Sequence, residues 1–213
     1  GRPAKGPPLS LGRNDLADLI SGRLEVDDDF EAVQALYLES GWTDGLPIMP
    51  PTLERVEAML ASTPLSPQDI IGEIPPNWGS ATVEKLAVNA MMAGCRPEYL
   101  PVIIAAVEAM CDEVFNLYAI QATTHPCAPL IIVNGPICEE LGLHGGSGAF
   151  GPGWQPNATI GRAVRLGQLN VGGAHPGVGD MSTQGAPSKY TYCVAENEEA
   201  NPWEPLHIER GFR

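Results

Sequence analysis

The chain has 213 residues, an apolar content of 44% and a formal charge of -14 at pH 7. This length and composition suit one sizeable hydrophobic core. The acidic balance opposes binding to nucleic-acid phosphates, and no apolar run approaches the ~20 residues that a membrane-spanning helix needs. We therefore expect neither a nucleic acid nor a membrane as a partner.

The five cysteines are scattered along the chain without close pairs. Reduced thiols in a cytoplasmic protein fit this pattern better than a dense disulfide framework does. We expect residues 1–41 to form an N-terminal arm with helices and residues 42–213 to form the main domain. The chain begins with Gly1 rather than Met and ends at Arg213 in an unremarkable run, which indicates part of a longer or processed polypeptide.

The first half of the chain predicts helices. The acidic triplet that ends at Asp29 is typical of a helix N-terminus, and Thr52 and Thr82 are suitable N-caps for two further helices. Gly94 marks the end of the third helix, and Pro97 opens a fourth that runs through Met110.

The second half predicts strands separated by glycine-rich loops. Phe115–Thr123, Leu130–Val133 and Tyr190–Ala195 are rich in β-branched and aromatic residues, and we expect the second to be buried on both faces. A short helix should end at Leu141, and a longer one should begin at Asn157. The pattern indicates an α/β or α+β fold, in which N-terminal helices pack on a mixed sheet and long glycine-rich loops form the site.

More than half of the 24 glycines lie between Asn134 and Asp180. Glycine supplies no side chain to the core and is used where the backbone must turn or approach a ligand, so we expect Gly146 and Gly148 to contact a bound molecule. Gly146, Gly148 and Gly151 match a Gly-x-Gly-x-x-Gly pattern, but about a dozen residues separate them from the preceding strand. We therefore expect no standard dinucleotide cofactor.

An anion site is predicted where the helix after this loop begins. Asn157 is a good N-cap, and Arg162 and Arg165 follow in the next turns. Free backbone N–H groups and a guanidinium favour a carboxylate or phosphate. The alternative is that both arginines pair with the surplus carboxylates of the chain.

Several side chains are candidates for acid–base, thiol or metal chemistry. His175 and Asp180 lie in the second glycine-rich loop and are the best proton-transfer candidates, with Glu196 following the last strand. Cys95 lies beside Arg96 and the start of the Pro97 helix, two features that lower a thiol pKa, although a small buried side chain is the equal alternative. His125 and Cys127, with Glu198, are candidate ligands for a transition metal, although two ligands at a two-residue spacing do not specify a particular ion.

Four motifs carry a resemblance to a known family. They are Thr43-Asp44-Gly45-Leu46-Pro47, Ala93-Gly94-Cys95-Arg96-Pro97-Glu98-Tyr99, Asn157-Ala158-Thr159-Ile160-Gly161-Arg162, and Ala195-Glu196-Asn197-Glu198-Glu199 with Pro202-Trp203-Glu204-Pro205-Leu206-His207. Over about residues 42–212 the chain resembles the bacterial UGSC-type (seleno)protein family, although it lacks the Cys-Gly-Ser-Cys motif. The resemblance implies a redox or thiol-linked enzyme. It carries over these positions as site residues: Asp44, Cys95, Arg96, Glu98, Tyr99, Asn157, Arg162, Glu196 and Glu198.

Two classes of function remain open. The first is an enzyme acting on a small anionic or carbonyl-containing molecule, with the anion held near Arg162, protons moved by His175, Asp180 or Glu196, and Cys95 as nucleophile or redox thiol. A metal-dependent hydrolase or lyase is a variant of this class. The second is a noncatalytic subunit that completes the active site of a partner chain, and a homo-oligomer is expected in either case.

Overall fold

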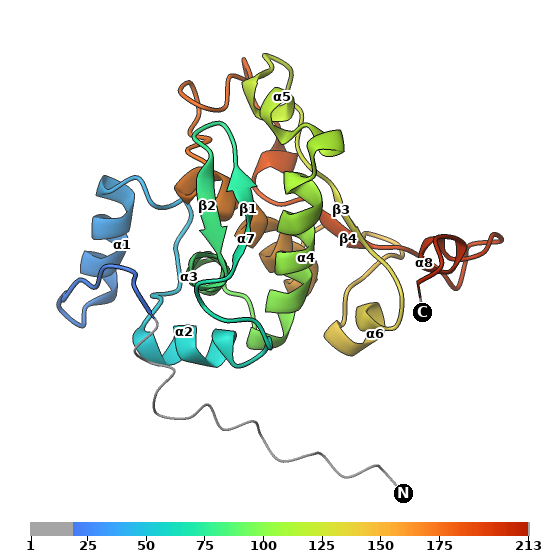
Figure 1. Ribbon diagram of the computed structural model, residues 1–213, viewed down its shortest axis with the longest axis horizontal. Coiled ribbons are helices and arrows are strands. Elements are labelled where there is room, and N and C mark those ends of the chain that lie inside the picture. Colours follow the sequence, from blue (N-terminus) through green and yellow to red (C-terminus); the bar gives the residue numbers. More distant parts are fainter. Residues whose placement is uncertain (1–18, 213) are drawn as a thin grey trace, which may run out of the picture.

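The computed structural model describes residues 19–212 (Figure 1). Its α-helices are α1 (Phe30–Glu39), α2 (Leu53–Leu60), α3 (Val83–Ala93), α4 (Leu100–Cys111), α5 (Leu117–Ala122), α6 (Ile137–Leu141), α7 (Gln155–Asn170) and α8 (Leu206–Glu209). The strands are β1 (Ile70–Ile74), β2 (Gly79–Thr82), β3 (Ile131–Val133) and β4 (Cys193–Ala195). Short 3-10 turns span Pro97–Tyr99, Glu113–Phe115 and Pro187–Lys189. The expected α+β class is confirmed.

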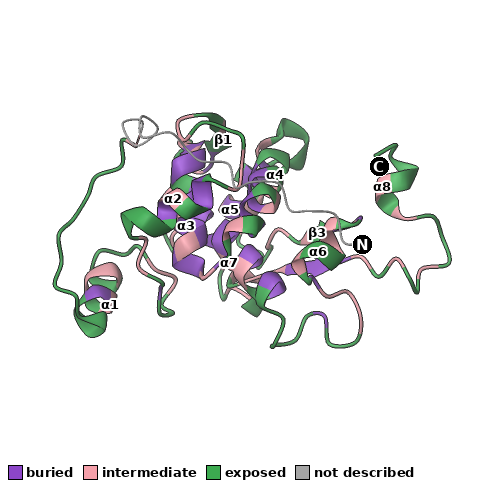
Figure 2. Cartoon of the chain, turned by 90° about the horizontal axis from the view of Figure 1, so that it is seen from below, coloured by how far each residue is buried: buried purple, intermediate pink, exposed green. Residues whose placement is uncertain are grey.

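The core lies between α3 and α7, with α2 and α4 packed around them (Figure 2). α3 begins as predicted, because the Thr82 hydroxyl accepts a hydrogen bond from the Lys85 N–H at 3.3 Å. It ends at Gly94, whose φ of 86° is left-handed. α7 buries Ile160, Leu166 and most of its other residues, whereas α1, α6 and α8 lie at the periphery and are largely exposed. α7 is therefore the central element on which a site can be fixed.

The strands form two separate pairs. β1 and β2 are an antiparallel hairpin against α4, and β3 and β4 are a parallel pair beside α7. β3 and β4 confirm two predicted strands, but Ile132 at the centre of β3 is 53% exposed, so the expectation of burial on both faces is wrong. The strand predicted over Phe115–Thr123 is also wrong: this segment forms the turn that ends at Phe115 and helix α5.

The wrong assignment has a local cause. The Asn116 side chain accepts a hydrogen bond from the Ala119 N–H at 3.3 Å and caps α5. This cap outweighs the strand preference of the aromatic and β-branched residues that follow it. None of the helices within residues 19–212 combines the length and apolar character that a bilayer crossing requires.

Candidate functional site

An open cleft of about 1040 Å³ lies between α7, the loop of residues 173–190 and the turn at Thr43 and Asp44. Its charged and titratable lining residues are Asp44, Arg165, His175, Asp180 and Lys189. Three of the residues predicted from the sequence, Asp44, His175 and Asp180, therefore meet in one place although they lie far apart along the chain. This cleft is the candidate site.

Three ion pairs, made by two aspartates, form the charged wall beside the cleft. Arg162 on α7 binds both carboxylate oxygens of Asp44. Its Nε donates to Oδ2 at 2.7 Å and its Nη2 donates to Oδ1 at 2.8 Å. One turn further, Asp180 Oδ2 lies 3.0 Å from Arg165 Nη2 and 2.8 Å from Lys189 Nζ. The side chains are largely buried, Asp44 at 4% and Asp180 at 3% exposure. Charges of opposite sign thus alternate along this wall.

Both aspartates are held ionised. Burial raises the pKa of Asp180, but Lys189, the Ser182 N–H and Arg165 outweigh it, so the pKa lies below the usual value. The pKa of Asp44 is likewise lowered, because the hydrogen bonds and charge of Arg162 outweigh burial. A carboxylate that is ionised and accepts several hydrogen bonds is a poor proton acceptor, so these contacts disfavour proton transfer by Asp180 itself, and its role beside His175 stays a prediction. His175 is the histidine that lines this cleft.

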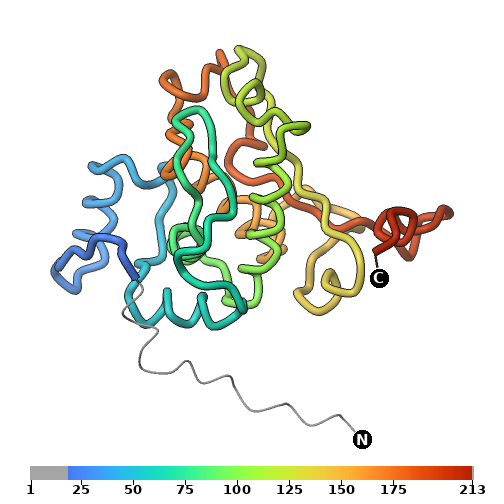
Figure 3. Tube along the Cα trace, viewed as in Figure 1, coloured from blue at the N-terminus to red at the C-terminus, as the bar shows by residue number. Residues whose placement is uncertain are grey.

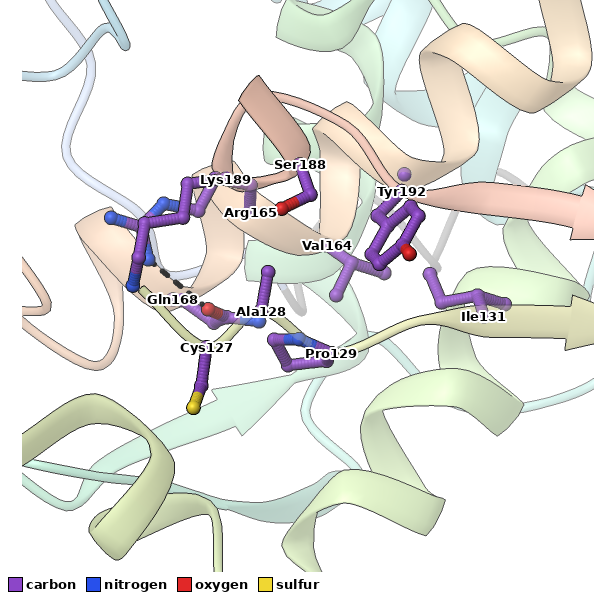
Figure 4. A pocket seen from close by; sticks show the side chains of 11 residues that line it. Cys127, Ala128, Pro129, Ile131, Val164, Arg165, Gln168, Ser188, Lys189 and Tyr192 are labelled. Atoms are coloured by element: carbon purple, nitrogen blue, oxygen red, sulfur yellow. Dashed lines mark hydrogen bonds between the residues drawn. The ribbon is translucent and has the colours of Figure 1, made fainter. Parts of the chain in front are cut away.

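Arg165 also connects the cleft to the protein interior. Its guanidinium donates to the Ala174 carbonyl at 3.2 Å and to Gln168 Oε1 at 3.3 Å. Arg165, Gln168 and Lys189 also line a second, much smaller pocket of about 10 Å³, which the exposed Cys127 lines as well (Figure 4). A volume of this size is at the lower limit for a single water molecule, so the open cleft and not this cavity can receive a substrate.

Lys189 was missed by the sequence analysis. It follows Gly185 and Pro187 in a loop that carries no strand or helix pattern, and nothing in its neighbours indicates a site. The rarity of lysine could have pointed to it. The chain has three lysines, Lys5, Lys85 and Lys189, and along the sequence Lys189 is the one Lys or Arg between Arg165 and Arg210. In a strongly acidic protein, such an isolated cation needs a partner or a ligand.

The prediction for the start of α7 is wrong. The helix begins at Gln155 and Asn157 lies inside it, where the side chain is buried. Asn157 Oδ1 accepts from the His144 N–H at 2.9 Å and Nδ2 donates to the His144 carbonyl at 2.8 Å. Asn157 therefore holds the preceding loop, and Arg162 pairs with a carboxylate, as the open alternative stated.

The glycines of residues 145–153 are explained in part by packing. A Cβ at Gly145 would clash with the Ala195 carbonyl oxygen of β4. Gly146 lies beside the His144 ring, which stacks on Trp154 with centroids 3.8 Å apart, and Gly148 has a φ of 76° in a turn. Close backbone packing and turn geometry thus account for glycine at these positions, and the contact with a ligand at Gly146 and Gly148 stays a prediction.

Cys95 does not have the properties expected of a reactive thiol. It is 3% exposed, and burial raises its pKa to about 12, although Thr159 and Arg162 oppose the rise. The predicted lowering of the pKa is therefore wrong. Tyr99 is 2% exposed and its pKa is also raised by burial, whereas Arg96 and Glu98 lie on the surface.

These environments predict the order of thiol reactivity. Cys127 is exposed, whereas burial raises the pKa of Cys193, like that of Cys95, to about 12. Because the thiolate is the nucleophile, we expect iodoacetamide at neutral pH to modify Cys127 first and to reach Cys95 and Cys193 only after unfolding. Peptide mapping by mass spectrometry measures this order. Fast modification of Cys95 in the folded protein would contradict it.

The predicted metal ligands are not brought together. His125 and Cys127 precede β3, and Glu198 follows β4. Because β3 and β4 are parallel, these residues lie at opposite ends of the strand pair. Glu198 instead accepts from the Gly135 N–H at 2.6 Å and lies 3.2 Å from His207 Nδ1. Within residues 19–212, no group of three His, Cys, Asp or Glu side chains is placed to hold a metal ion.

Glu196, which was predicted to move protons, accepts hydrogen bonds from three residues of the protein. Its carboxylate accepts hydrogen bonds from Asn134 Nδ2 at 3.0 Å, from Asn201 Nδ2 at 3.2 Å and from the Leu206 N–H at 3.3 Å. These bonds fasten the C-terminal segment to the end of β3.

Comparison with protein-family models, with curated proteins and with solved structures found no match to this chain.

Proposed function

We propose that the protein is an enzyme that binds a small anionic, carbonyl-containing molecule in the cleft beside Arg165 and Lys189. The observation that supports this most is the charge balance. Arg165 and Lys189 balance Asp44 and Asp180 on the cleft lining, and Arg162, which pairs with Asp44 but does not line the cleft, adds a further positive charge beside it, although the chain as a whole carries -14. A local positive excess in a strongly acidic protein favours an anionic ligand.

The proposed roles follow from the contacts. Lys189 extends from a loop into the cleft and donates to the anion, and Arg165, held by Asp180, supports the same charge. Hydrogen bonds from either cation to a carbonyl oxygen stabilise negative charge that develops there. His175, the histidine that lines the cleft, moves the proton, because an imidazole ring can both donate and accept one. The thiol step implied by the family resemblance is not part of this proposal, since Cys95 is buried with a raised pKa.

Ligand binding tests the proposal. The protein is screened by thermal shift and calorimetry against small carboxylates, oxo acids and phosphate esters. We expect Lys189→Gln to weaken binding of the best ligand at least about tenfold, because a hydrogen bond to a charged group contributes roughly 1.5–3 kcal/mol. His175→Asn should retain binding and lose turnover.

Lys85→Gln is the matched control. Lys85 donates to the Ser80 carbonyl on the β1–β2 hairpin and does not line the cleft, so its loss should leave the affinity unchanged. Equal weakening by Lys85→Gln and Lys189→Gln would show a nonspecific effect of charge and would refute the proposal. So would the absence of stabilisation by every anion tested.

A further inference from the structure

β3 has one unpaired edge. It is hydrogen-bonded to β4 through the Ile131 N–H, which donates to the Tyr192 carbonyl at 3.0 Å, and the Val133 carbonyl, which accepts from the Glu196 N–H at 2.8 Å. Backbone groups of successive residues alternate between the two sides of a strand. The N–H and C=O of Ile132 therefore point to the opposite side, where no other strand lies within residues 19–212.

The unpaired edge opens into a cleft of about 640 Å³. Ile132, Asn134, residues 135–137 and Glu140 of α6 line this cleft together with Leu206, His207, Arg210 and Phe212 of the C-terminal segment. This segment, residues 199–212, is called the C-terminal arm. It extends away from the body of the protein in Figure 1 and in the trace of Figure 3, which has the same view, and also in the turned view of Figure 2. Four of its large apolar side chains are exposed: Trp203 at 79%, Phe212 at 70%, and Leu206 and Ile208 at 41% each.

The charge distribution indicates what can fill the cleft. The segment Val114–Cys138, which contains β3, has no Asp, Glu, Lys or Arg, although the whole chain carries -14. Two copies of such an acidic protein repel one another over most of their surfaces. They can approach closely where a strand carries no charge and exposes an apolar side chain, as β3 does at Ile132. The charged side chains that line the cleft beside it, Glu140 and Arg210, are of opposite sign.

We propose that β3 pairs with β3 of a second copy of this chain, antiparallel and across a twofold axis. The Ile132 residues of the two copies then lie opposite each other as a hydrogen-bonded pair, with Cα atoms about 5.5 Å apart. The result is a four-stranded sheet in the order β4-β3-β3-β4. Such an isologous contact closes after two copies, and the C-terminal arm of each copy covers the strand of the other.

A disulfide across the axis tests the pairing directly. Cysteines about 5.5 Å apart at Cα are within the range that a disulfide spans. In a Cys127→Ser background, which removes the exposed native thiol, we expect Ile132→Cys to form a covalent dimer on mild oxidation. Ile70→Cys is the control, because Ile70 is also an exposed strand residue, at 63%, but lies on the β1–β2 hairpin; it should stay a monomer on a non-reducing gel.

A second pair of variants tests the same contact without oxidation. Ile132→Lys places two positive charges at the axis, and we expect it to raise the dimer dissociation constant about 100-fold or more, since like charges in contact cost several kcal/mol. Ile70→Lys should leave it unchanged. Molar mass by light scattering at several protein concentrations measures both, and circular dichroism establishes that each variant is folded.

Three outcomes would overturn the proposal. They are a wild-type protein that is monomeric at all concentrations, a dimer that Ile132→Lys leaves intact, and covalent dimers formed equally by Ile70→Cys and Ile132→Cys. Because the edge of β3 and the cleft with Lys189 are formed by different residues, ligand binding and dimer formation are tested separately.

Discussion

Asp180→Asn should lower the free energy of unfolding by about 3 kcal/mol, because the substitution removes the negative charge between two largely buried cations. Asp180 Oδ2 lies 3.0 Å from Arg165 Nη2 and 2.8 Å from Lys189 Nζ, and the side chains of these cations are 10% and 11% exposed. Asparagine has nearly the same shape as aspartate, so the loss of stability reports the removal of the carboxylate charge and not a change in side-chain volume. Urea unfolding followed by circular dichroism gives the value.

The matched control is Asp28→Asn. Asp28 is exposed near the start of α1, and substitutions at such surface positions usually change the stability by less than about 0.5 kcal/mol. A loss at Asp180→Asn no larger than that of Asp28→Asn would show that the two cations do not depend on the carboxylate.

The same variant predicts a difference in pH dependence. The pKa of Asp180 is lower in the folded protein than its usual value of 3.8, so its contribution is present above the pKa of the unfolded chain and is lost as the pH falls through the folded pKa. The wild-type protein should therefore lose stability below about pH 4. Asp180→Asn should lose less over this range, and parallel curves for the two proteins would contradict the assignment.

Two glycines of α7 should respond to alanine in opposite directions. A Cβ at Gly161 would clash with the Thr191 hydroxyl and lie 2.6 Å from the Tyr192 backbone nitrogen, at the entry to β4. Because backbone atoms cannot move aside cheaply, we expect Gly161→Ala to destabilise the protein by about 3 kcal/mol. At Gly167 the Cβ would meet only Leu86 Cδ2, at 3.9 Å. Gly167→Ala should therefore stabilise the protein by about 0.5–1 kcal/mol, the helix-propensity difference between the two residues.

Thermal and urea unfolding of the two variants measure both changes in the free energy of unfolding, the expected decrease for Gly161→Ala and the expected increase for Gly167→Ala. The two substitutions are chemically identical and lie in the same helix, so each is the control for the other. Destabilisation by both, to a similar extent, would mean that α7 is sensitive to any added methyl group and that the contact of Gly161 with the chain before β4 is not special.

The helices were predictable where a local signal sets their ends. Asp29 and Thr82 accept hydrogen bonds from the backbone N–H groups of Ala32 and Lys85, and these caps are visible in the sequence. The β1–β2 hairpin was missed, since the prolines around Pro75 indicate a break and the strands are short. The hairpin is stabilised by packing of β1 on α4, and such long-range packing leaves no local pattern.

The site was predictable only in part, for a similar reason. Asp44, His175 and Asp180 were named for their chemistry, and the fold brings them to one cleft. The sequence could not show that Asp180 is fixed between Arg165 and Lys189, because that depends on how a loop returns to α7. Cys95 was misjudged because its pKa depends on burial, which the neighbouring residues in the sequence do not reveal.

The attachment of α1 bears on how large a ligand the cleft with Lys189 can admit. Gln34 binds Ile48 twice, with its side-chain N–H donating to the carbonyl at 2.9 Å and its oxygen accepting from the N–H at 2.8 Å, and Val33 is the buried residue of the helix. A unit held by so few contacts opens at a small fraction of the global unfolding free energy. The turn at Thr43 and Asp44 follows this helix but is fastened to α7, because Arg162 binds the Asp44 carboxylate and the Pro47 carbonyl. When α1 opens, this rim of the cleft therefore stays in place, and the cleft admits no larger ligand than it does in the closed protein.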